Sequence, residues 1–204
     1  GPRRVRAGPR EPAEGARDAQ GQRPAGAHGS AAGLRDGHAD GDIEAGGGLT
    51  IPDWALHWVH GVYNFYRFQG DADAVKVFMP TIERILRWYM PYQTSTGVIK
   101  DIVEWNLVDW SSVSRADTSS VISALWARGL REFAEMANWL EERSSQRWAE
   151  GLYDRVKAGF ELFWDERRGA YVDHIVDGAQ QPEMSQLAGA LAICAGLAPA
   201  ERWS

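Results

Sequence analysis

The sequence predicts an all-α protein in which antiparallel helix pairs form part of a ring, a toroid, behind an N-terminal tail without regular structure. All 10 Trp, 6 Tyr and 6 Phe fall after residue 50, so only that part can build a core. There, apolar residues recur at spacings of three and four, the period of an amphipathic helix. Irregular stretches collect at alternate connections between the expected helices, as in a helical ring whose loops line a central pit.

Residues 1–48 are expected to be disordered. The stretch before residue 51 holds 12 of the 22 Gly and seven Arg, and few large aliphatic residues that could offset the entropy of ordering. Two origins stay open for this tail. It is a natural low-complexity extension, or it is a shifted-frame translation of GC-rich DNA, whose G- and C-only codons encode Gly, Ala, Arg and Pro. In the second case the frame changes near Gly46–Gly48.

The first helix is expected between Pro52 and Gly70, because Pro suits a first turn and Gly favours a helix end. Asp71 is expected to cap the next helix. Two apolar stripes run along the first helix, which we therefore expect to be covered on both sides. One stripe is Trp54, Trp58, Val62 and Phe65, and the other is Leu56, Val59, Tyr63 and Tyr66.

Further helices are expected over residues 72–90, 117–141, 145–164 and 183–196. Pro80 should kink the second helix or mark its true start. Residues 98–110 read as extended or looped, and RRGAYVDHIVDG at 167–178 reads as one short hairpin. Cys194 is expected to be buried. No fixed period of 34 or 40 residues supports the alternative architecture, a helical-repeat solenoid.

Charge and hydropathy exclude several partner classes. The net charge of -6 argues against a nucleic-acid or anionic-membrane partner. No apolar run reaches the roughly 18 residues of a membrane span. The N-terminus lacks the apolar stretch of a signal peptide, and a single cysteine cannot form an intrachain disulfide. We therefore expect a cytoplasmic rather than a secreted location.

Aromatic rings beside carboxylates indicate a carbohydrate ligand. A sugar has an apolar C–H face that stacks on an aromatic ring and a belt of hydroxyls that bind polar side chains. PDWALHW at 52–58 and VEWNLVDW at 103–110 both place an Asp directly beside a Trp. An Asp in an apolar cluster is costly unless it is paired or used. The alternative is that these Trp residues only fill the core.

Other chemistries have little support in the sequence. Neither a GxGxxG nor a P-loop pattern occurs. His57 and His60 lie three apart, as in half of a metal site, but we expect them to be polar or partly buried helix positions. Ser111, Ser112 and Ser114 lack the context of a nucleophile elbow. No metal and no cofactor are expected.

From about residue 49 the chain resembles bacterial α-L-rhamnosidases, in which the same series of motifs occurs in the same order. The series is IPDWALHWV, YNFYRFQGD, the helix around Trp88, LVDW at 107–110, FWDERRGAYVD at 163–173 and SQLAGALAICAGLAP at 185–199. The resemblance implies a six-hairpin glycosidase domain with an (α/α)6 toroid. It also implies inverting hydrolysis of terminal α-linked rhamnose, without a metal in the chemistry.

The resemblance carries over binding residues but no catalytic ones. The family's acidic motif (D-x-P-x-R-x-E-R) cannot be read upstream of IPDW, and its general base lies beyond residue 204. We therefore expect an internal fragment that is inactive alone and needs the remainder of its own catalytic domain. Trp54 and Trp110 match the aromatics that wall the rhamnose pocket. Their neighbours Asp53 and Asp109 should orient polar groups, and Trp58 and Trp105 are further candidates.

Two other functions stay open at this point. One is another (α/α)6 sugar-active enzyme, an unsaturated glucuronyl hydrolase or a sugar epimerase. In an epimerase, His57 and His60 would face the central pit as acid and base. The other is a helical interaction module without catalysis.

Overall fold

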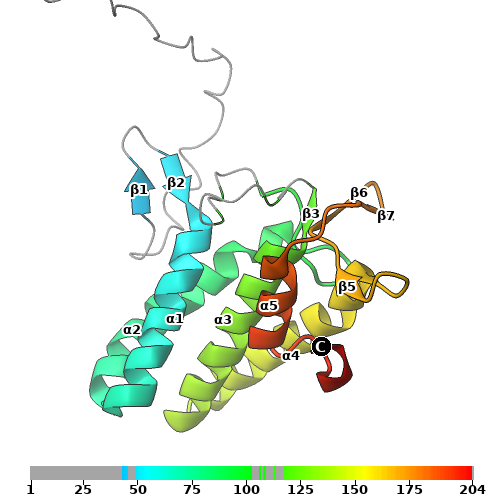
Figure 1. The fold of residues 1–204 in the computed structure, drawn as a ribbon. Coiled ribbons are helices and arrows are strands. Elements are labelled where there is room, and N and C mark those ends of the chain that lie inside the picture. Colours follow the sequence, from blue (N-terminus) through cyan, green and yellow to red (C-terminus); the bar gives the residue numbers. More distant parts are fainter. Residues whose placement is uncertain are drawn as a thin grey trace, which may run out of the picture.

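The computed structural model describes residues 43–45, 49–102, 106, 108, 113 and 117–203, with only the backbone for 43–50. Five α-helices account for most of these residues (Figure 1). They are α1 (Pro52–Gln69), α2 (Ala72–Trp88), α3 (Ser120–Trp139), α4 (Arg143–Phe160) and α5 (Gln186–Cys194). Single turns of 3-10 helix follow at Met90–Tyr92, Glu161–Phe163 and Ala200–Arg202. The predicted all-α class, with hairpins α1–α2 and α3–α4, is confirmed.

Short strands form three antiparallel sheets at the ends of the helices. The strands β1 (Ile43–Ala45) and β2 (Leu49–Ile51) pair with each other, as do β4 (Trp164–Asp165) and β5 (Ala170–Tyr171). The third sheet has the order β3 (Thr118–Ser119), β6 (His174–Val176), β7 (Ala179–Gln180). The remainder of the predicted tail, residues 1–42 and 46–48, lies outside the described residues.

Local chemistry explains where the helices begin and end. Gly70 ends α1 with a left-handed φ of 66°, and the Asp71 side chain accepts a hydrogen bond from Ala74 N at 3.0 Å, as predicted. Helix α2 runs through Pro80. Because Pro80 has no backbone N–H, the carbonyl of Lys76, four residues earlier, lacks its usual helical hydrogen-bond donor. Both residues are exposed, so water can bind that carbonyl.

Helix α3 is the centre of the core. It contacts α1, α2, α4 and α5, and 15 of its 20 residues are buried. Our prediction that the first helix is covered on both sides was wrong for this chain. Trp54 is 40% exposed, Phe65 37% and Phe68 85%, because α2 and α3 cover only the opposite face of α1.

Two further predictions need correction. The stretch 167–178 does not form one hairpin, because Tyr171 pairs with Trp164 upstream and Ile175 pairs with Gln180 downstream. Each of the two hairpins has its own turn, and the second turn, Asp177–Gly178, has positive φ at both residues. Cys194, expected to be buried, is exposed on the last turn of α5. None of the described helices is long and apolar enough to cross a lipid bilayer.

Candidate functional site

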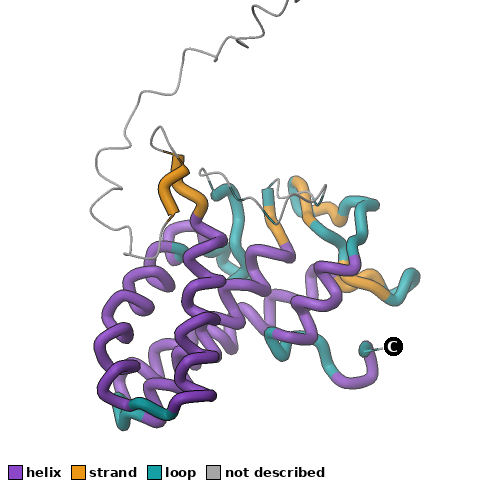
Figure 2. Tube along the Cα trace, turned by 60° about the vertical axis from the view of Figure 1, so that its left-hand side comes forward, coloured by secondary structure: helices purple, strands orange, loops and turns teal. Residues whose placement is uncertain are grey.

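The long connections meet at one end of the molecule. The turns from α1 to α2 and from α3 to α4 are short, whereas residues 89–119 and 161–185 separate the later helices. The odd-numbered helices (α1, α3 and α5) therefore all begin at the end where β2, β3 and β6 lie (Figures 1 and 2). We call this the loop end.

Asp53 attaches the first long connection to α1. Its side chain is fully buried, and its Oδ2 accepts a hydrogen bond from the backbone N–H of Val108 at 2.9 Å. A buried carboxylate is tolerated where donors of this kind satisfy it. Asp53 therefore holds the backbone of Val108 against the first turn of α1.

Asp173 joins the starts of α3 and α5 at the same end. Its carbonyl oxygen accepts hydrogen bonds from the Ser120 N–H at 3.0 Å and the Ser120 hydroxyl at 2.9 Å. Its Oδ1 accepts from the N–H of Ser185 at 2.9 Å and from the hydroxyl of that residue at 2.6 Å. Ser185 caps α5 through Ala188 N. Asp173 thus connects the start of α3 to the start of α5.

A pocket of about 340 Å3 opens between the first turns of the odd-numbered helices. On the α1 side the pocket is lined by two rings that carry N–H groups, Trp54 and His57. On the other sides the described lining is purely aliphatic, with Val108 from the loop, Val121 and Leu125 from α3, and Leu187 and Leu191 from α5. Such a pocket suits a small ring with one polar and one apolar side.

A polar cluster lies one to two turns further along the same faces of α1 and α3. His60 Nδ1 lies 2.7 Å from Glu132 Oε1, and Asn64 Nδ2 donates to His60 Nε2 at 3.2 Å. The network therefore has His60 Nδ1 as the donor to Glu132. Arg128 Nε is 3.7 Å from the same carboxylate oxygen.

Burial dominates the electrostatics of this cluster. The Glu132 side chain is 3% exposed, and burial raises the pKa of its carboxyl group despite the opposing effects of His60 and Arg128. In the described part of the chain, Glu132 Oε2 and Arg128 Nη2 have no hydrogen-bond partner. The cluster is therefore a low-dielectric site that disfavours the charged form of Glu132.

The predicted site residues do not all lie together. Asp53 and Trp54 are at the loop end, Asp53 under the loop and Trp54 at the pocket. Trp58 packs edge to face on Phe78, with ring centroids 5.9 Å apart, between α1 and α2. The other three candidates, Trp105, Asp109 and Trp110, lie outside the described residues.

His57 is the lining residue that the sequence argument undervalued. It follows Trp54 by three residues and so lies on the same face of the helix. This spacing alone could have predicted that His57 lies beside Trp54. No sequence pattern predicted the α5 residues of the lining, because only the fold brings α5 to the pocket. Among the described residues, no group of three or more His, Cys, Asp or Glu side chains could hold a metal ion.

Hairpin helices in part of a ring, with long connections gathered around a pocket at one end, define the class of six-hairpin glycosidases. The family model of the bacterial alpha-L-rhamnosidase 6 hairpin glycosidase domain matches residues 40–203. The chain belongs to this family. The match starts before residue 49, so residues 40–48, which we assigned to the tail, fall within it.

Solved structures with the same fold include two rhamnosidases. A GH78 family rhamnosidase of Bacillus sp. GL1 superposes with a TM-score of 0.70 at 21% identity over 76% of this chain. A rhamnosidase from Klebsiella oxytoca with rhamnose bound gives 0.67 at 16% identity over 83%. The chain spans 17% and 33% of the lengths of those two proteins. No curated protein sequence matches the chain.

Proposed function

We propose that this domain is part of an enzyme that hydrolyses terminal α-L-rhamnosides with inversion, and that the loop-end pocket binds the rhamnose ring. The observation that carries the proposal is the pocket itself, which the first turns of three helices build in a domain of this family. The rhamnose reported with the Klebsiella oxytoca protein supports the choice of sugar.

The chemistry of the lining suits this ligand. Rhamnose has a face of C–H groups that can stack on the Trp54 ring, and it has hydroxyls that can bind a polar ring such as that of His57. Its deoxy carbon, a methyl group, is compatible with the aliphatic walls from α3 and α5. Trp54 is the only Trp, Tyr or Phe among the described residues that line this pocket, so it is the residue on which stacking depends.

Hydrolysis needs groups that this lining does not supply. Inversion requires one carboxylic acid and one carboxylate, roughly 6.5–9.5 Å apart, on opposite faces of the sugar. No described lining residue is acidic. We therefore assign binding to these residues and expect that the 204-residue chain binds rhamnose without hydrolysing an aryl rhamnoside.

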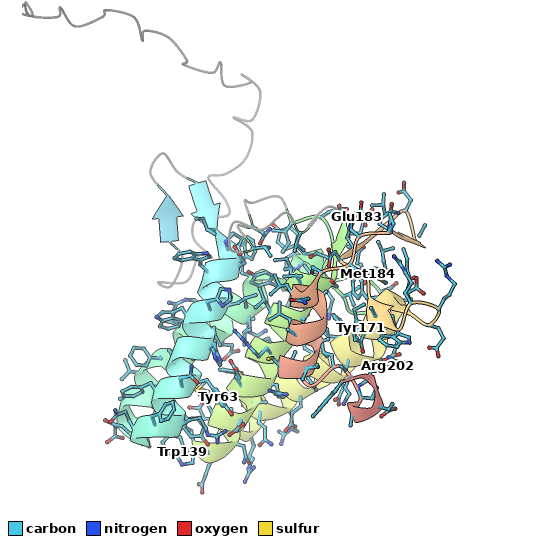
Figure 3. The ribbon with its side chains drawn as sticks, viewed as in Figure 1. Tyr63, Trp139, Tyr171, Glu183, Met184 and Arg202 are labelled. Atoms are coloured by element: carbon cyan, nitrogen blue, oxygen red, sulfur yellow. The ribbon has the colours of Figure 1, made fainter. Side chains whose placement is uncertain are left out.

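Tryptophan fluorescence during a rhamnose titration tests the proposal. We expect a saturable change in emission for the wild-type chain and its loss in Trp54→Ala. Trp139→Ala is the matched control, because Trp139 is 36% exposed, similar to Trp54, but lies at the other end of α3 (Figure 3). A rhamnose response that survives unchanged in Trp54→Ala would contradict the proposed pocket. No response in any variant would favour a helical interaction module.

A further inference from the structure

The helix α1 carries an exposed stripe at one end of the row of odd-numbered helices. Its residues are Trp54, Gly61, Phe65 and Phe68, at successive spacings of seven, four and three, so they lie along one side of the helix. This side faces away from α2 and α3, which cover the opposite face of α1. We call the four residues the α1 edge.

The helix α5 carries the exposed stripe at the other end of the row, because α3 lies between α1 and α5 (Figure 1). Its residues are Ala190, Ile193 and Cys194, all exposed and all small or aliphatic. We call them the α5 edge. Because Gly61 has no side chain and Ala190 has only a methyl group, two helices that meet along these edges can approach closely.

Two copies of the chain can pair the two edges and close a ring. All three odd-numbered helices begin at the loop end (Figures 1 and 2). A two-fold axis parallel to them therefore places α1 of each copy beside α5 of the other, with all six helices pointing the same way. A domain of six hairpins has one such helix from each hairpin. Two copies supply the same number.

The exposed area favours a closed pair over an open row of copies. Trp54 is 40% exposed, Phe65 37% and Phe68 85%, and side chains of this size have on the order of 200 Å2 of surface each. The α1 edge therefore exposes on the order of 300 Å2, and one junction buries on the order of 600 Å2 on its two sides together. A stable interface needs roughly 1,000 Å2. Two junctions, on the order of 1,200 Å2, reach this size.

We infer that the 204-residue chain forms a two-fold dimer in which the α1 edge of each copy packs on the α5 edge of the other. The dimer does not depend on the proposed hydrolysis, because both edges lie outside the loop-end pocket except at Trp54. Gln186 is exposed at the start of α5. In the dimer, the Gln186 of the second copy lies close to Trp54, so the second copy borders the pocket.

A cross-link between residue 61 and the natural Cys194 tests the junction. Trp54 and His57 line the same pocket as Leu187 and Leu191, so α1 and α5 begin at similar heights. Gly61 is the tenth residue of α1 and Cys194 the ninth of α5, and both therefore lie roughly 12–14 Å along the helix. A Cβ on Gly61 would meet nothing within 4 Å, so Gly61→Cys should fold.

A short bis-maleimide should link Cys194 of one chain to the new thiol of the other in Gly61→Cys. Thiols held together in a junction have an effective concentration in the millimolar range. At about 10 μM protein the link should therefore form on the order of 100-fold faster than by random collision. Denaturing gels detect the covalent dimer, and mass spectrometry of its peptides identifies the linked residues.

Gly151→Cys is the matched control. It adds the same thiol at an exposed helical glycine whose Cβ would also meet nothing within 4 Å, but on α4, away from both edges. It should show only the rate of random collision. The wild-type chain should not be linked quickly either, because its two Cys194 residues lie at opposite junctions of the dimer. Circular dichroism establishes that each variant is folded.

Sedimentation equilibrium of the wild-type chain completes the test. We expect a dimer without larger species, and a monomer for folded Phe65→Glu, since this one substitution places a charge in both junctions. A link between two residues at position 61, a series of growing oligomers, or a folded Phe65→Glu that stays dimeric would each overturn the inference. A monomeric wild-type chain would also overturn it and would leave the two edges to another protein segment.

Discussion

At the scale of single residues, two buried aspartates hold the loop end together, and the sequence identified only one of them. Asp53 attracted attention because a carboxylate beside Trp54 in an apolar stretch needs a partner. Its partner, the N–H of Val108, lies 55 residues away in a loop without periodicity, so no local rule could predict it. Asp173 sits in a stretch that predicted only a hairpin, and its contacts with Ser120 and Ser185 depend on the fold.

Replacing Asp53 should test its role as a positioning residue. Asp53→Ala leaves the buried N–H of Val108 without its acceptor, which typically costs about 1–3 kcal/mol of unfolding free energy. Asp53→Asn keeps an acceptor oxygen for this N–H and should therefore lose less unfolding free energy than Asp53→Ala. Some loss remains, because a neutral amide oxygen forms a weaker hydrogen bond than a carboxylate. Urea denaturation measures both losses, and equal losses in the two variants would refute this account.

Glu132 should make stability depend on pH in the opposite sense to an ion-paired carboxylate. Burial raises its pKa above the ordinary value of 4.5, and the charged or titratable groups that oppose this are His60 from α1 and Arg128 and Arg131 from its own helix. Above about pH 4.5 the folded chain therefore retains a proton that the unfolded chain has lost. The unfolding free energy attributable to Glu132 falls as pH rises through the raised pKa.

Glu132→Gln removes this titration. The difference in unfolding free energy, variant minus wild type, should grow from about pH 4.5 upward and level off once the folded wild type is ionised. Denaturant midpoints between pH 4 and 8 provide the measurement. A difference that shrinks with rising pH would show that attraction to His60 and Arg128 outweighs burial, and a constant difference would show that the two effects cancel.

At the scale of elements, periodicity predicted the helices well and the connections poorly. The apolar residues of α2 to α4 recur at spacings of three and four, and most of them are buried. Helix α3 begins three residues later than predicted, because Thr118 and Ser119 pair with β6. The second hairpin could have been predicted from Asp177–Gly178, a dipeptide typical of two-residue turns.

Two glycines of α4 provide a matched test of element packing. A Cβ on Gly159 would overlap the carbonyl oxygen of Thr96, where the turn before Gly97 lies against the helix. A Cβ on Gly151 would meet nothing within 4 Å. The same substitution should therefore have opposite effects at the two positions.

Gly159→Ala should lower the unfolding free energy by roughly 1–3 kcal/mol, since overpacking against backbone outweighs the gain in helix propensity. Gly151→Ala should raise it by about 0.5–1 kcal/mol through propensity alone. Thermal melts followed by circular dichroism compare the two. Stabilisation by Gly159→Ala would mean that the turn can move away from α4 at little cost.

At the scale of the whole molecule, the ring architecture was predictable but the exposure of its edges was not. Helical pairing with long alternate loops indicated the toroid, and the family match agrees with it. The sequence pattern of α1 is that of a helix covered on two sides, yet Phe65 and Phe68 are exposed. On the α5 side, Leu162, Ile193 and Trp203 are exposed in the same way. Exposed apolar side chains of this size favour association.

The 204-residue chain should therefore self-associate, and Phe68 should contribute strongly because it is 85% exposed. Phe68→Glu removes apolar surface and adds a charge, whereas Gln69→Glu adds the same charge at the next exposed position. Sedimentation velocity over a range of concentrations should show less association for Phe68→Glu only. An equal decrease in association for the two variants would mean that the added charge, and not the lost apolar surface, is responsible. A wild-type chain that stays monomeric at all concentrations would contradict the prediction.

The exposed thiol of Cys194 has a practical consequence for such measurements. Because the sequence contains one cysteine, a maleimide dye or a nitroxide attached to the wild-type chain would report from a single known point, the last turn of α5. The same thiol can link two chains under oxidising conditions. A covalent dimer would then imitate association through the apolar edges, so comparison of samples with and without reductant separates the two.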